Sequence, residues 1–181
     1  NQPIMELAEK MPNAADGSIS ADGLTYTYTL KPDLKWSDGE PLTSADFKFT
    51  WEAIMDPANT CIISRLGYDS IESIETPDDV TAVVKFSSFY APWGNLFAMS
   101  GNSGAGLIPK HVLEGQVLDN NDFLRQPITA GAYYVESWVQ GDLITLQAND
   151  NYFRGRPKID TIFIKMVPSR EALLAALQTG D

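Results

Sequence analysis

The clearest pattern in the chain is a strict alternation of apolar and polar residues from Leu24 to Leu30. Leucines and tyrosines occupy every second position, and threonines lie between them. Successive side chains of a strand point to opposite faces, so this pattern predicts a half-buried β-strand. Similar runs predict a hairpin of strands at 71–75 and 80–86, and three further strands at 132–139, 143–148 and 160–167.

A helical period begins directly after Thr43. Apolar residues then recur every three or four positions, which predicts a helix from about Ser44 to Met55. Thr43 is a good N-cap residue, and Asp46, three residues later, takes the acidic position of a capping box. The helix ends at Asp56-Pro57, because proline cannot continue it. The apolar stripe of this helix consists of Phe47, Trp51 and Ile54.

Weaker helical patterns occur elsewhere in the chain. They predict a final helix over 170–178 and one or two helical turns over 108–114, and they make the aromatic-rich stretch 89–99 a candidate short helix. The apolar residues of 1–12 also have helix-like spacing. Strands and helices are therefore mixed and several strands form hairpins, which favours an α+β architecture over a doubly wound parallel sheet.

Composition and charge narrow the classes of function. The 181 residues are 44% hydrophobic, enough for a packed core, and 24 acidic against 13 basic residues give a formal net charge of -11. Nucleic acids and anionic membrane surfaces both need a positive footprint, so neither is an expected partner. The single cysteine, Cys61, excludes a disulfide within the chain, and the single histidine, His111, excludes a zinc site built from histidines. We expect no metal and no cofactor.

The segment Lys35–Phe47 joins a turn directly to the capped helix. It closely resembles a signature of the extracytoplasmic solute-binding proteins of family 5, which serve oligopeptide, dipeptide and nickel ABC importers. One departure is Ala132, because many members have proline at this position. Further segments resemble the family in the same order along the chain: Leu7–Glu9, Asp22–Tyr26, Pro77–Val83, Ile108–Lys110, Thr129–Tyr133, Asn149–Phe153 and Ala176–Asp181.

This resemblance implies a fold of the periplasmic-binding-protein type II kind, with mixed and antiparallel sheets and flanking helices. The chain would be an incomplete N-terminal lobe, cut from a longer protein whose C-terminal lobe is absent here. Residues 1–16 would lead in from the larger part of the lobe. Residues 17–126 would form a smaller subdomain, and residues 127–181 would begin the return into the larger ligand-binding part.

The function implied by the resemblance is solute binding rather than catalysis. The chain would be a fragment of the substrate-binding component of an ABC importer. Its partners would be a peptide or another small solute, bound in a cleft between two lobes, and the permease of the inner or cytoplasmic membrane. The protein would be a monomer outside the cytoplasm, in the periplasm or as a cell-surface lipoprotein.

Two aromatic or polar stretches are candidates for contacts with the solute. In the irregular segment after the first helix, the resemblance points to Ser64, Arg65 and Tyr68. Arg65 can pair with a carboxylate and Tyr68 can stack or donate a hydrogen bond. Tyr90 and Trp93 belong to a second cluster of rings. For both stretches the alternative is structural, a surface arginine with a half-buried tyrosine and a set of core aromatics.

Two glycine-containing loops complete the candidate site. Asn102 lies in a loop of small residues whose backbone N–H groups can cradle an anion, although a flexible surface loop is the alternative. Pro127, Thr129 and Gly131 lie in an extended connection that is expected to cross between subdomains, and they are the candidate hinge residues.

Two other classes of function remain open. A carboxylate-dependent hydrolase of glycosides or esters needs a defined pair of acids, and no spacing singles one out among the many carboxylates. No Gly-x-Ser-x-Gly elbow accompanies His111 either. A carbohydrate-binding or interaction module needs an exposed aromatic platform, so buried tryptophans would count against it.

Overall fold

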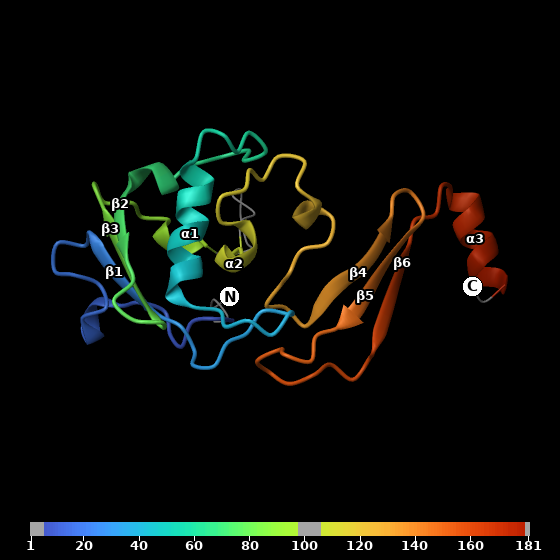
Figure 1. The fold of residues 1–181 in the computed structure, drawn as a ribbon, viewed down its shortest axis with the longest axis horizontal. Coiled ribbons are helices and arrows are strands. Elements are labelled where there is room, and N and C mark those ends of the chain that lie inside the picture. The colour runs from blue at the N-terminus through green and yellow to red at the C-terminus, as the bar shows by residue number, and fades with distance from the viewer. Residues whose placement is uncertain (1–5, 98–105, 180–181) are drawn as a thin grey trace.

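The computed structural model describes residues 6–97 and 106–179 of the chain (Figure 1). Its strands and helices are β1 (Thr25–Thr29), α1 (Ser44–Met55), β2 (Ile71–Glu75), β3 (Thr81–Phe86), α2 (Lys110–Leu113), β4 (Tyr133–Val139), β5 (Leu143–Ala148), β6 (Thr161–Lys165) and α3 (Arg170–Thr179). The described residues also form short 3₁₀ turns at Ala14–Asp16, Tyr68–Ser70, Trp93–Asn95 and Asp122–Leu124.

The first sheet is antiparallel and has the strand order β1-β3-β2. Tyr26 pairs with Val84 on β3, and Val84 pairs in turn with Ile74 on β2. Helix α1 lies beside this sheet (Figure 1), and the two enclose the main core. The buried members of this core are Tyr26, Phe47, Ile54, Tyr68, Ile71, Ile74, Ala82, Val84, Phe86 and Leu96.

Helix α1 begins where its cap forms. The Thr43 side chain accepts a hydrogen bond from the N–H of Ala45, and the Asp46 carboxylate accepts one from the N–H of Thr43 at 2.8 Å. Asp46 is buried and also accepts hydrogen bonds from Trp36 Nε1 (3.4 Å) and from the N–H of Lys110 (2.8 Å). The same carboxylate therefore caps α1 and fixes the start of α2.

Two smaller cores flank the first. One contains Leu30, Leu34, Trp36 and Leu42, with Leu7 and Phe153 packed against it from distant parts of the sequence. The other contains Ala53, Leu113 and Leu118 and joins α1 to the loop that follows α2.

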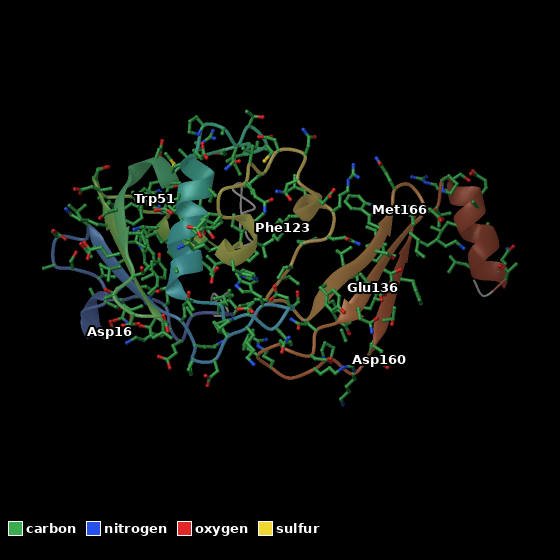
Figure 2. The ribbon with its side chains drawn as sticks, viewed as in Figure 1. Asp16, Trp51, Phe123, Glu136, Asp160 and Met166 are labelled. Atoms are coloured by element: carbon green, nitrogen blue, oxygen red, sulfur yellow. The ribbon has the colours of Figure 1, made fainter. Side chains whose placement is uncertain are left out.

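The second sheet is an antiparallel meander of order β4-β5-β6, and it lies with α3 at the other end of the molecule (Figure 1). Trp138, Ile144 and Ile164 are aligned across its strands. Side chains fill the space between α1 and the first sheet, whereas Glu136 and Met166, both exposed, lie at the second sheet (Figure 2). Among residues 6–97 and 106–179, no helix is long and apolar enough to cross a membrane.

The α+β architecture, the bounds of α1 and the β2–β3 hairpin are confirmed, as are all the predicted strands to within two residues. The helix predicted over 89–99 is wrong for its described part, where only the 3₁₀ turn Trp93–Asn95 forms. No helix forms in residues 6–12 either, because Ala8 makes an antiparallel bridge with Leu30. The two sheets lie on opposite sides of the proposed boundary at 126–127, and the division into subdomains stays a prediction.

Candidate functional site

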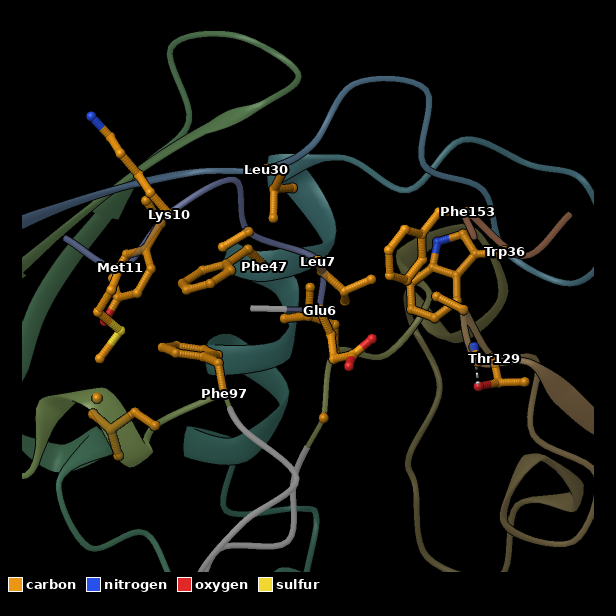
Figure 3. A pocket seen from close by; sticks show the side chains of 18 of the residues that line it. Glu6, Leu7, Lys10, Met11, Leu30, Trp36, Phe47, Phe97, Thr129 and Phe153 are labelled. Atoms are coloured by element: carbon orange, nitrogen blue, oxygen red, sulfur yellow. Dashed lines mark hydrogen bonds between the residues drawn. The ribbon is translucent and has the colours of Figure 1, made fainter. Parts of the chain in front are cut away.

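A cavity of about 650 Å³ opens between the N-terminal segment, β1, α1 and the crossing from the first sheet to the second (Figure 3). This volume lies within the range of small-molecule sites, about 300–1,000 Å³. Figure 3 shows Phe47 and Phe97 on one side of the cavity and Trp36 and Phe153 on the other, with Leu7 between them. The lining is therefore mainly apolar and aromatic.

The first aromatic wall is held by the core behind it. The Phe47 and Phe97 rings have centroids 4.0 Å apart, and Tyr28 packs on Phe47 at 5.2 Å. Phe97 has a φ of 59°, which is uncommon for a residue with a side chain. The Tyr68 hydroxyl accepts a hydrogen bond from the N–H of Phe97 at 2.9 Å and so stabilises this conformation. Burial raises the pKa of Tyr28, which therefore stays a neutral phenol.

The second wall joins segments that are far apart in the sequence. The Trp36 ring is buried, and the Phe153 ring packs into the same small core. Two cations lie over the Phe153 ring, with Lys31 Nζ at 4.5 Å and Arg154 Cζ at 5.2 Å from its centroid. Arg154 also forms an ion pair with Glu6 at 3.0 Å. The N-terminal segment and the turn after β5 are thus held together at the cavity.

Arg65, Tyr68 and Ser64 are not among the residues that line the cavity. Arg65 donates hydrogen bonds to the carbonyl groups of Ile54 (2.7 Å) and Asp56 (3.0 Å), so it caps the C-terminal end of α1. Tyr68 is fully buried in the main core, and the Ser64 hydroxyl accepts a hydrogen bond from the N–H of Leu66. In this structure all three have structural partners, and their contact with a solute stays a prediction.

Tyr90 and Trp93 pack at the edge of the main core. Trp93 lies against Tyr26 with ring centroids 4.5 Å apart, and Tyr90 stacks on Phe86 at 6.3 Å. Neither ring lines the cavity, and Asn102 lies outside the described residues.

Unlike the other described candidates, two residues of the predicted hinge segment lie in the lining of the cavity. Thr129 and Gly131 both line the cavity. Figure 3 shows Thr129 next to Trp36. The connection that contains Pro127 does run from the first half of the chain to the second sheet. Sequence reasoning thus reached part of the cavity through its crossing segment. It missed the aromatic walls, for which the only local signals were Phe47 in the signature segment and Phe153 at the end of an asparagine-rich motif.

The chemistry available at the cavity is that of binding. Rings and aliphatic side chains offer stacking and apolar contacts, while Glu6, Lys10 and Thr129 supply polar groups at its lining. In the described part of the chain, no group of three or more His, Cys, Asp or Glu side chains is arranged to hold a metal ion.

The four tryptophans do not form a common platform. Trp36 is buried, Trp51 donates a hydrogen bond to the carbonyl of Tyr68 at 3.2 Å, and Trp93 packs on the main core. Trp138 is exposed, but it lies on the second sheet, away from the other three. Among the four tryptophans only Trp138 is exposed, so the tryptophans offer no shared aromatic platform for a carbohydrate.

Comparison with known proteins gives a match over nearly the whole chain. Residues 2–181 match the family model described as bacterial extracellular solute-binding proteins, family 5 Middle. The oligopeptide-binding protein AppA of Bacillus subtilis is 36% identical over 166 residues, which cover 88% of this chain and 29% of that protein.

Solved structures agree with this match. The structure of B. subtilis AppA in complex with a nonapeptide superimposes with a TM-score of 0.83 at 30% identity, over 98% of this chain and 34% of that one. NikZ from Campylobacter jejuni in complex with Ni(L-His) gives a TM-score of 0.81 at 26% identity, over 97% of this chain and 33% of that one. The chain thus spans about a third of the length of the relatives that it matches.

Proposed function

The chain belongs to family 5 of the bacterial extracellular solute-binding proteins, and we propose that it is one part of the substrate-binding component of an ABC importer for peptides or related small solutes. The observation that carries this proposal is the family match over residues 2–181. The expected family and the expected fold, a type II periplasmic-binding-protein lobe present in part, are confirmed by the same comparisons.

A peptide is the first candidate for the solute. The relative with 36% identity is named for oligopeptide binding, and its solved structure holds a nonapeptide. The NikZ structure, with Ni(L-His), has nearly the same TM-score. One scaffold can host different ligands, so the site itself must decide between them. The mainly apolar and aromatic lining favours a solute with apolar side chains over a small charged complex.

The cavity is the proposed contribution of this chain to the solute site. Its aromatic walls would contact the solute, and a second lobe outside these residues would close over it. Such domain closure is a common way for binding proteins to sequester a ligand. Tyr68 would then act from behind the wall by holding the backbone of Phe97.

The wider setting follows from the family. Family 5 proteins are extracellular by description, and we place this protein outside the cytoplasm, in the periplasm or as a cell-surface lipoprotein. There it would act as a monomer and deliver its solute to a membrane permease. The relatives compared here are binding proteins, and this favours binding over hydrolysis for the whole protein.

Calorimetry on two forms of the protein tests the proposal. The 181-residue chain and the full-length gene product are each titrated with pooled nonapeptides, with B. subtilis AppA as the positive control. We expect heats of binding from the full-length product and very weak or no binding from the 181-residue chain, because one lobe cannot close over a solute. Micromolar binding by the 181-residue chain alone would contradict the two-lobe account.

Two further outcomes would overturn the proposal itself. One is a full-length product that binds no peptide pool under conditions in which AppA binds. The other is turnover of chromogenic glycosides or esters that a single carboxylate substitution abolishes, because this would identify a hydrolase.

A further inference from the structure

A closed ring of hydrogen bonds joins three loops between the two sheets. The N–H of Ser37 donates to the carbonyl of Thr129 (2.8 Å), and Thr129 Oγ1 accepts from the N–H of Gly131 (3.0 Å). The Gly131 carbonyl accepts from Asn149 Nδ2 (2.8 Å), and Asn149 Oδ1 accepts from the N–H of Asn151 (2.9 Å). Asn151 Nδ2 donates to the carbonyl of Ser37 (3.3 Å), which closes the ring.

Asn149 is the most constrained member of this ring. Its side chain is fully buried; its amide N–H donates to the crossing at Gly131, and its amide oxygen accepts from Asn151 within its own loop. Its backbone N–H donates to the carbonyl of Ala132 at 2.9 Å, at the start of the second sheet. A buried amide that loses its partners is costly, so this geometry is strongly specified.

Each loop of the ring carries part of the cavity lining. Trp36 precedes Ser37, Thr129 lies in the crossing, and Phe153 follows the loop that begins at Asn149. Trp36 and Phe153 form the second wall of the cavity, and Thr129 lies next to Trp36 in its lining (Figure 3). The relative positions of the three loops therefore determine the shape of this wall.

We propose that Asn149 is a positioning residue, which locks the two sheets into one rigid unit and sets the second cavity wall before a solute arrives. The crossing that contains Thr129 and Gly131 is then a fixed joint and not a hinge. A preorganised wall avoids the entropic cost of ordering these side chains on binding. The binding consequence rests on the proposed function, whereas the rigidity of the joint does not.

Distances between spin labels test the rigid joint without any solute. The full-length gene product carries Cys61→Ser, and labels are placed at Glu52→Cys on α1 and Glu136→Cys on β4. We expect one narrow distance distribution in this background. Asn149→Ala should broaden it at least twofold, whereas Asn121→Ala, the same change at an asparagine outside the ring, should leave its width unchanged. A broad distribution before any ring substitution, or an unchanged width in Asn149→Ala, would overturn the proposal.

Thr129 supplies a matched pair of variants in case Asn149→Ala does not fold. Thr129→Val keeps the shape of the side chain but removes the oxygen that accepts from Gly131, while Thr129→Ser keeps that oxygen. We expect the distance distribution to broaden in Thr129→Val and to stay narrow in Thr129→Ser. Equal widths in both variants would show that the ring does not hold the joint.

Affinity for pooled nonapeptides then tests the positioning role. Thr129→Val should weaken binding roughly 5- to 10-fold relative to Thr129→Ser, as expected for the loss of one partly buried hydrogen bond. Equal affinities in the two variants, together with a broadened distance distribution in Thr129→Val, would overturn the positioning role. If no form of the protein binds peptide, the proposal that the solute is a peptide is wrong. The distance measurement still decides whether the joint is rigid.

Discussion

Gly67 and Tyr90 are in close contact at the edge of the main core. Gly67 has a φ of 86°, and a Cβ atom built on it would lie 2.5 Å from Cζ of Tyr90. Gly17 has a similar φ of 77°, but a Cβ atom there would have no other atom within 4 Å. A substitution at Gly17 would therefore cause backbone strain alone, whereas one at Gly67 would cause both backbone strain and a steric clash.

We expect Gly67→Ala to lower the free energy of unfolding by about 1–3 kcal/mol more than Gly17→Ala does, because only Gly67→Ala also overpacks the core. Both variants share the cost of a left-handed backbone at a residue with a Cβ atom. Urea unfolding of the 181-residue chain measures the difference. Equal losses in the two variants would mean that Tyr90 moves aside without cost.

At single residues, the sequence indicates chemistry better than orientation. Arg65 and Tyr68 carry groups that suit a peptide, and both were reasonable candidates for contact with it. The structure directs the Arg65 guanidinium to the carbonyl groups at the end of α1, and it buries the Tyr68 ring among core side chains. These partners come from tertiary packing, so no local pattern around residues 64–68 could have specified them.

Among the elements, the β2–β3 hairpin is closed by an acidic turn. Asp78 Oδ1 accepts hydrogen bonds from the N–H groups of Val80 (3.0 Å) and Thr81 (2.8 Å). Mainly through the bond from Val80, these interactions lower the pKa of the Asp78 carboxyl below its ordinary value of 3.8. Folding therefore favours the ionised form of the Asp78 carboxyl.

The sign of the resulting pH dependence follows from linkage. A lowered pKa in the folded state stabilises the protein above the unfolded pKa, and this contribution is lost as the pH falls through the folded pKa. We expect wild type to be more stable than Asp78→Asn at about pH 6, and this advantage to shrink as the pH falls toward about 3. Urea unfolding of both proteins across this pH range measures the difference in their free energies of unfolding. A difference that does not change with pH would contradict the lowered pKa of Asp78.

Elements with a strong local period were predictable from sequence. Helix α1 has both an apolar stripe and a capping box, and its bounds were predicted correctly. The described part of the stretch 89–99 does not form the expected helix, because Tyr90, Trp93 and Phe97 each pack separately onto the core. The central position of β3 between β1 and β2, and the meeting of distant segments at the cavity, depend on long-range packing that has no local signature.

Across the whole molecule, burial is uneven. The three core clusters draw their buried residues from the stretch 26–118 of the chain. In the second sheet, Trp138 is 44% and Phe163 67% exposed, and the buried positions of its strands are Thr145 and Ala148. The second sheet thus has far less apolar packing to stabilise it than the first.

We expect the amides of β4, β5 and β6 to exchange with solvent at least tenfold faster than those of β1 and β3 in the isolated 181-residue chain, because local stability follows buried apolar contacts. Hydrogen exchange measured by mass spectrometry on peptides from the two sheets tests this. Similar protection of both sheets would show that the second sheet is stabilised by something other than the packing described here.

The strand order of the first sheet also bears on how the protein is made. All three of its strands lie within residues 25–86, and none of their pairings needs a later residue. This segment precedes β4 in the chain, so a chain that emerges from the membrane N-terminus first can close the first sheet before β4 appears. Emergence in this order exposes the sparsely packed meander only when a folded neighbour is already in place.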